Sequence, residues 1–138
     1  MKTIILYYSW SGKTETLASK KAEELGADIE SVCDLKRTTM FGAFFIGCPK
    51  SIGRKKTKIK PINTDLSIYE KIIVMAPVWA GHPAPVFNNI AELIPSGKKI
   101  EIIMISGGGG TKKSEEGTKK LFTDRGCEVV SYTDVISK

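Results

Sequence analysis

The chain has 138 residues, and its 21 Lys and Arg against 15 Asp and Glu give a formal charge of +6. This length is typical of one domain with its own core. Three widely spaced cysteines without a C-x-x-C pair argue against a disulfide framework or a thiolate metal site. Because no apolar run is long enough to span a bilayer and no signal-peptide pattern is present, we expect a cytoplasmic protein without a transmembrane segment.

The first predicted strand covers residues 4–7, an apolar run that leads into a turn and a helix. Leu17, Ala18, Ala22 and Leu25 recur at helical spacing, with charged residues between them. Gly26 stands where a helix often ends. The pattern predicts a helix over residues 13–25.

The turn between this strand and this helix is rich in hydroxyl side chains and contains one glycine, Gly12. A Walker A loop would need a second glycine at the position of Tyr7, and a Rossmann turn would need further glycines. Hydroxyls together with the unpaired N–H groups of a helix N-terminus suit a terminal phosphate. An ordinary cluster of helix caps is the alternative. The residues of the predicted phosphate loop are Ser9, Trp10, Ser11, Gly12, Lys13 and Thr14.

The remaining elements alternate between strand and helix patterns. Residues 27–32 alternate apolar with polar and predict an edge strand, whereas residues 72–76 and 100–105 resemble the first strand in being buried on both faces. Val86, Ile90 and Ile94 predict a helix between Pro85 and Pro95. A last helix, capped by Ser114 with Leu121 and Phe122 facing inward, precedes a second edge strand at residues 127–132.

This alternation predicts an α/β fold: a doubly wound, five-stranded parallel sheet in the order 2-1-3-4-5, with helices on both faces and the whole chain in a single domain. In such sheets, ligands bind at the carboxyl ends of the strands, where the strand order reverses. The turns leaving the first, third and fourth predicted strands, at residues 9–14, 77–83 and 106–111, should therefore meet at one crevice.

These three turns resemble those of the flavodoxin-like FMN-binding proteins of the short-chain type. The shared features are the Ser9-x-Ser11-Gly12-x-Thr14 loop, the Pro77-Val78-Trp79-Ala80-Gly81 run and a Ser-Gly-rich loop after the fourth strand. The resemblance implies FMN as cofactor, with its phosphate in the hydroxyl loop and its isoalloxazine against the other two loops. It implies no metal and no side-chain acid or base. Beyond the phosphate loop, the implied site residues are Pro77, Val78, Trp79, Ala80, Gly81, His82, Ser106, Gly107 and Gly108.

Individual residues suit these roles. Trp79 can offer a flat face for stacking on the flavin, although a tryptophan of the core or of a lid is the alternative. Gly81 can bring a backbone group to the reactive flavin nitrogen, N5. Gly107 and Gly108 leave room for a planar ligand, or form a plain turn. His82 is either a hydrogen-bond former of its loop or a neighbour of the flavin or substrate.

Two features depart from the electron-carrier flavodoxins, which are typically acidic and often cover the flavin with a second aromatic residue. Here the charge is +6, and residues 106–111 include no aromatic side chain. Trp10 and the apolar segment 40–48 are candidates to cover the open flavin face. The alternatives for this segment are a helix packed on the sheet, a lid over the flavin or its substrate, and an interfacial element that meets anionic lipid. A basic cluster follows it: Lys50, Arg54, Lys55, Lys56, Lys58 and Lys60.

The sequence therefore predicts an FMN-binding electron-transfer protein that exchanges electrons with redox partner proteins. The alternative is an FMN-dependent NAD(P)H oxidoreductase acting on a quinone or similar acceptor, and a regulatory binding module on the same fold is a third possibility. Nucleic-acid binding is not predicted, because the basic cluster has no interleaved aromatics and no recognition module. The oligomeric state stays open.

Overall fold

The computed structural model describes residues 2–35, 52–54, 56–108 and 110–137. The expectations for the apolar segment 40–48, for Lys50 and for Lys55 fall outside these residues. No helix in the described ranges is long and apolar enough to cross a membrane.

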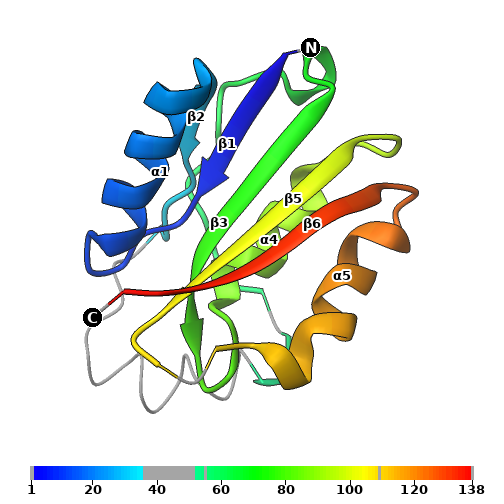
Figure 1. The fold of residues 1–138 in the computed structure, drawn as a ribbon. Helices are drawn as coiled ribbons and strands as arrows, with labels where there is room; N and C mark the ends of the chain where they lie inside the picture. The colour runs from blue at the N-terminus through cyan, green and yellow to red at the C-terminus, as the bar shows by residue number, and fades with distance from the viewer. Residues whose placement is uncertain (1, 36–51, 55, 109, 138) are drawn as a thin grey trace.

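Five parallel strands form the sheet (Figure 1). Their spatial order confirms the predicted topology, with two mixed strands at the edges and three apolar strands between them. In spatial order they are β2 (Asp28–Ser31), β1 (Thr3–Tyr7), β3 (Lys71–Trp79), β5 (Lys99–Ser106) and β6 (Glu128–Ile136). The last strand runs beyond its predicted end at residue 132.

Helices cover both faces of the sheet, as predicted (Figure 1). On one face, Ile5 and Tyr7 of β1 pack with Ala18 and Ala22 of α1 (Lys13–Leu25). The alternate residues of β1 belong to the larger core on the other face, with α4 (Pro85–Leu93) and α5 (Glu115–Thr123). Because successive side chains of a strand point to opposite faces, the apolar central strands supply both cores.

The start of α5 differs from the sequence expectation. Ser114 occupies the N-cap position, but its side chain makes no capping hydrogen bond to the helix. Instead, the hydroxyl donates to the carbonyl of Gly81, 2.7 Å away. A short 3-10 helix, η3 (Lys112–Ser114), leads into α5, and a second one, η2 (Leu66–Ile68), precedes β3. Phe122 is buried as predicted and meets Phe87 edge to face, with ring centroids 5.6 Å apart.

Residues 77–83 form a β-hairpin, so their prediction as a loop was wrong. β3 continues to Trp79, and the two-residue strand β4 (His82–Pro83) pairs with its end in antiparallel fashion. The turn residues Ala80 and Gly81 both have positive φ, at 53° and 75°, which is the geometry that joins twisted strands through two residues. Pro77 and Pro83 both lie within the paired strands, because strands tolerate proline where its missing N–H is not needed.

Candidate cofactor site

The three predicted turns meet at the carboxyl ends of the parallel strands. The rings of Trp10 and Trp79 join the first turn to the hairpin, with centroids 5.9 Å apart. The backbone N–H of Ser137 donates to the carbonyl of Ser106 at 2.7 Å, and the Lys13 ammonium reaches the Ser137 carbonyl at 3.3 Å. The end of β6 therefore links the first turn to the glycine-rich loop.

The Ser9 side chain stabilises the predicted phosphate loop through hydrogen bonds to its backbone. Its hydroxyl oxygen accepts hydrogen bonds from the backbone N–H groups of Gly12 and Glu15, both at 3.1 Å. Gly12 has φ 96°, a conformation that glycine adopts without strain. The loop is thus closed onto the first turn of α1 by a side chain that the sequence had placed among the phosphate ligands.

The groups left for an anion are backbone amides and exposed hydroxyls. Within the described residues, the N–H groups of Lys13 and Thr14 have no acceptor, and the Ser11 side chain is exposed. Thr14 is buried. Because unpaired amides at a helix N-terminus carry partial positive charge, this end of α1 can hold a phosphate. The Lys13 ammonium bonds to the Ser137 carbonyl instead.

Trp79 is packed into the core and keeps only 9% of its surface exposed. Its ring meets Tyr8 and Trp10 edge to face, at 6.3 Å and 5.9 Å between centroids. Trp10 is only partly buried and packs on the rim of the same core. Stacking of Trp79 on a flavin stays a prediction, and the geometry makes Trp10 the more accessible ring of the pair.

A pocket of about 650 Å³ separates the hairpin turn from the glycine-rich loop. A Cβ added at Gly107 or Gly108 would meet no atom within 4 Å, so the space beside both glycines is open. The two charged lining residues are Lys112 and Lys113, which the sequence analysis did not identify. The lining residues are Val78, Ala80, Gly81, Ser106, Gly107, Gly108, Gly110, Lys112 and Lys113.

His82 takes part in its own hairpin, because one ring nitrogen, Nδ1, lies 3.1 Å from the Ala80 carbonyl. This contact supports the loop hydrogen-bond role that was one of its two interpretations. Pro77 and Val78 lie in β3, at its paired end.

Three further residues hold the glycine-rich loop and were missed by sequence reasoning. The backbone N–H and the hydroxyl of Thr111 donate to Asp134 Oδ1, at 3.1 Å and 2.7 Å, and the Thr111 and Tyr132 hydroxyls share another hydrogen bond. Burial raises the pKa of the Tyr132 phenol. No local signal could reveal these contacts, since the partners belong to different elements.

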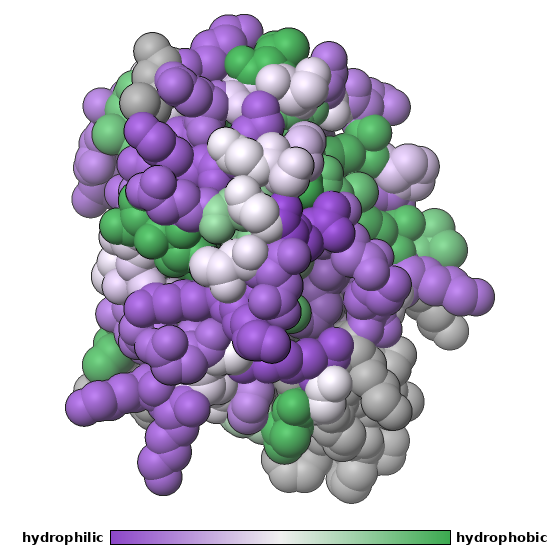
Figure 2. Space-filling view, turned by 90° about the vertical axis from the view of Figure 1, so that its right-hand side faces the viewer, coloured by the Kyte–Doolittle hydropathy of each residue, from purple (hydrophilic) through white to green (hydrophobic). Residues whose placement is uncertain are grey.

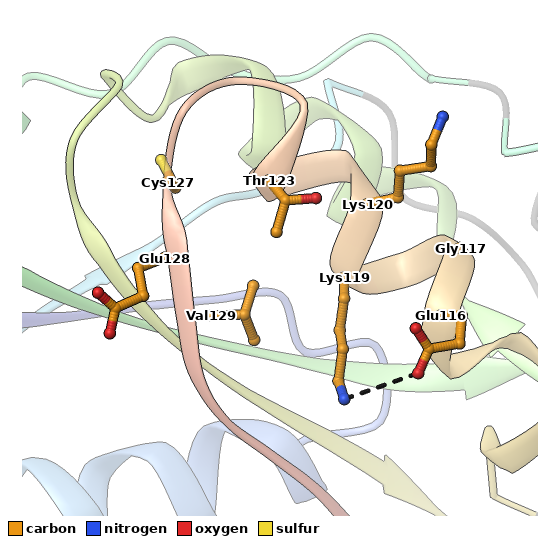
Figure 3. Close-up of a pocket in the computed structure, with 8 residues that line it drawn as sticks. All are labelled: Glu116, Gly117, Lys119, Lys120, Thr123, Cys127, Glu128 and Val129. Carbon is orange, nitrogen blue, oxygen red and sulfur yellow. Dashed lines mark ion pairs between the residues drawn. The ribbon is translucent and has the colours of Figure 1, made fainter.

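Two other hollows are lined by different residues. One, of about 230 Å³, adjoins the phosphate loop and is lined by Tyr8, Ser9, Trp10, Cys33, Asp34, Leu35 and Lys60. The other, of about 690 Å³, lies between α5 and β6. Figure 2 looks onto the α5 side of the molecule, where the surface is mostly hydrophilic. Figure 3 shows that Glu116, Lys119 and Glu128 line this second hollow, with Lys119 paired to Glu116; no predicted site residue lines it.

Metal ligation has no support in the described part of the chain, where no group of three or more His, Cys, Asp or Glu side chains could hold an ion.

No protein-family model and no curated protein matches the chain. Among solved structures, a flavoprotein from Lactobacillus acidophilus NCFM in complex with FMN is 26% identical, with a TM-score of 0.80, and the match covers 96% of this chain and 92% of that one. A protein from Bacteroides eggerthii DSM 20697 is 18% identical, with a TM-score of 0.84 and coverage of 99% and 89%. Oxidised flavodoxin 2 from Bacillus cereus is 16% identical, with a TM-score of 0.53 and coverage of 99% and 86%.

Proposed function

From the flavodoxin-like fold that this chain shares with FMN-binding flavoproteins, we propose that it binds FMN at the carboxyl ends of its strands and transfers electrons. The observation that carries the proposal is the phosphate loop. Ser9 braces the loop, and the amides of Lys13 and Thr14 have no acceptors in the described chain. When bound, FMN supplies transfer of one or two electrons.

The chain's own residues divide the work of binding. The amides of Lys13 and Thr14 and the hydroxyls of Ser11 and Thr14 hold the phosphate, without a basic side chain. The pocket between the hairpin turn and Gly107 and Gly108 takes the ring system, because its walls are mostly backbone and leave space for a flat group. These walls also keep water from part of the ring.

A second function, hydride transfer from NAD(P)H, is favoured by one observation. Lys112 and Lys113 line the pocket, and no carboxylate is among its lining residues. Two ammonium groups without an acidic neighbour in the lining attract an anion, and a nicotinamide dinucleotide is an anionic donor. An electron carrier would instead meet a redox partner protein at the same opening.

The phosphate loop can be tested with the variant carrying Ser11→Ala and Thr14→Ala. We expect FMN binding to weaken by about 2 to 4 kcal/mol, because each lost hydroxyl removes a charge-assisted hydrogen bond to the phosphate. The measurement is a titration of the apoprotein with FMN, followed by flavin fluorescence. Riboflavin lacks the phosphate and should bind the variant and the parent alike. Equal FMN affinity in both proteins would contradict the assignment of the loop.

Steady-state kinetics separate the two redox functions. An oxidoreductase should oxidise NADPH in the presence of a quinone, with turnover that depends on bound FMN. A carrier should instead pass electrons from a reduced partner protein to an oxidised one, and should leave NADPH unchanged over the same time.

A further inference from the structure

Ala80, Arg54 and Gly117 adopt conformations or positions that their residue types disfavour. Ala80 and Arg54 have left-handed backbones, with φ 53° and 51°, which are unfavourable for residues with a Cβ. Gly117 stands inside α5, where glycine weakens a helix. When several residues of one small region occupy conformations that their residue types disfavour, a functional constraint is often the reason. Arg54 lies against Gly117 and donates to Ser114. Ser114 donates to Gly81, the neighbour of Ala80 in the hairpin turn.

Arg54 reaches α5 through both ends of its guanidinium. Its Nη1 donates to Thr118 Oγ1 at 3.0 Å, and its Nη2 donates to the Ser114 carbonyl at 2.9 Å. A Cβ on Gly117 would lie 2.8 Å from Nη2, so a larger residue here would require the guanidinium to shift. The placement of Arg54 thus explains the glycine inside the helix.

Ser114 connects these contacts to the pocket between the hairpin turn and the glycine-rich loop, called the cofactor pocket below. Its hydroxyl, buried with 6% of the residue exposed, donates to the Gly81 carbonyl at 2.7 Å and lies 3.2 Å from the Thr111 carbonyl. Thr118 is fully buried and donates to the Ser114 carbonyl at 3.0 Å. Ser114 is therefore held by α5 and by Arg54, and it holds the turn of the hairpin in place.

We propose that Arg54 and Ser114 form a clamp that positions the Gly81 carbonyl at the wall of the cofactor pocket. The proposal rests on the proposed FMN site. Two-electron reduction of a bound flavin would add electrons and a proton from solvent, so that a ring nitrogen would become an N–H donor and favour a nearby acceptor. The hydrogen bond from Ser114 holds the Gly81 carbonyl toward the start of α5, so it competes with the flavin for this acceptor. The clamp thus favours oxidised over reduced flavin, and Arg54 and Ser114 act as positioning residues.

The first test is Ser114→Ala, compared with Ser114→Thr, which keeps the hydroxyl, and with Ser96→Ala, an exposed serine outside the clamp. With saturating FMN, we expect the alanine variant to bind reduced flavin about tenfold better relative to oxidised flavin, a rise of about 30 mV in the two-electron midpoint potential. In the apoprotein, amide hydrogen exchange of residues 79–83 should become about tenfold faster. Ser114→Thr and Ser96→Ala should match the parent in both.

A second test leaves every hydroxyl in place. Gly117→Ala should push the Arg54 guanidinium away, and Arg54→Gln should remove its charge and one of its two contacts. Because alanine is the better helix former, Gly117→Ala should by itself stabilise α5, and without a clamp it should not speed amide exchange in the hairpin. If the clamp exists, amide exchange of residues 79–83 should become faster in both variants. Lys58→Gln, an exposed change in the same part of the chain, is the control.

The outcomes separate the clamp from the proposed function. If the parent does not bind FMN, the proposed function fails, while exchange in the apoprotein still decides whether the clamp restrains the hairpin. If FMN binds but Ser114→Ala, Gly117→Ala and Arg54→Gln all keep the parent's potential and exchange rates, the clamp is wrong. Faster exchange with an unchanged potential would overturn its redox role.

Discussion

Ser9 shapes the proposed phosphate site through the backbone, because its hydroxyl accepts hydrogen bonds from two amides of the loop. Ser9→Ala should leave these N–H groups without their acceptor and lower the free energy of unfolding by about 1 to 2 kcal/mol, as for other lost helix caps. Urea denaturation of the apoprotein measures this change. Ser11→Ala is the matched control, since the exposed Ser11 should alter stability by less than about 0.5 kcal/mol. Equal stability of the two variants would contradict the bracing role.

Trp10 and Trp79 differ in burial, and this difference predicts that their removal destabilises the fold to different extents. Trp79→Ala should lower the free energy of unfolding by about 3 to 5 kcal/mol, because the ring is part of the core. Trp10→Ala should cost less stability. If Trp10 covers the flavin, its loss should restore flavin fluorescence that the parent quenches. Recovery of fluorescence in a folded Trp79 variant, but not in the Trp10 variant, would return the stacking role to Trp79.

At the scale of elements, Glu101 ties one helix to two strands. Its carboxylate on β5 pairs with Lys71 of β3 at 3.0 Å and with Lys21 of α1 at 3.4 Å. Burial opposes its ionisation, but the hydrogen bond from Lys71 and the two positive charges outweigh burial, so the pKa of Glu101 lies below its usual value. The folded state therefore favours the ionised carboxylate.

Glu101→Gln should lower the free energy of unfolding by about 1 to 2 kcal/mol at neutral pH, a value between those of exposed and buried ion pairs. A lowered pKa contributes stability above the ordinary pKa of a glutamate, and this stability is lost as the pH falls through the lowered value. Urea denaturation between pH 7 and pH 3 should thus show the difference between parent and variant shrinking as the pH falls. Glu128→Gln, at an exposed glutamate, should show no such convergence.

The elements that the sequence predicted well are those whose signals are local. The apolar runs of β1, β3 and β5 and the spacing of Leu17, Ala18 and Ala22 mark buried strands and a helix face without knowledge of the rest of the chain. The hairpin at residues 77–83 was not predicted, because its second strand is only two residues long and contains a proline. The Thr111–Asp134 and Arg54–Ser114 contacts join residues far apart in sequence, which no periodicity can reveal.

At the scale of the whole molecule, the fold is retained while the sequence diverges. The Lactobacillus flavoprotein superposes on nearly the whole chain at 26% identity, although no family model matches. A sheet with apolar strands buried on both faces accepts many combinations of Ile, Val, Leu and Met, provided that volume and patterning are kept. The constraints of this chain are instead concentrated in its turns, where Gly12, Gly81 and Ser114 hold conformations and contacts that few residues allow.

Positive charge is distributed unevenly over this fold. The structure divides the predicted basic cluster: Arg54 is turned toward α5, and Lys56 pairs with Glu92 at 2.7 Å. Lys112 and Lys113 are exposed at the cofactor pocket and have no ion pair within the described residues. Any attraction of an anionic donor to the pocket should therefore depend mainly on these two lysines.

Replacing both, as Lys112→Gln with Lys113→Gln, should slow reduction of the flavoprotein by NADPH about 3- to 10-fold at low salt, since two charges at the opening are lost. Stopped-flow kinetics measure this rate. As added salt shortens the Debye length from roughly 30 to 10 Å, the reduction rate of the parent should fall more steeply than that of the variant.

Lys20→Gln with Lys99→Gln removes the same charge from exposed positions outside the pocket and should change the rate little. An uncharged dihydronicotinamide should reduce all three proteins equally. A parent reduction rate that is independent of salt, or an equal decrease of this rate in both double variants, would mean that these lysines do not guide the donor. The positive charge would then only keep the surface hydrated.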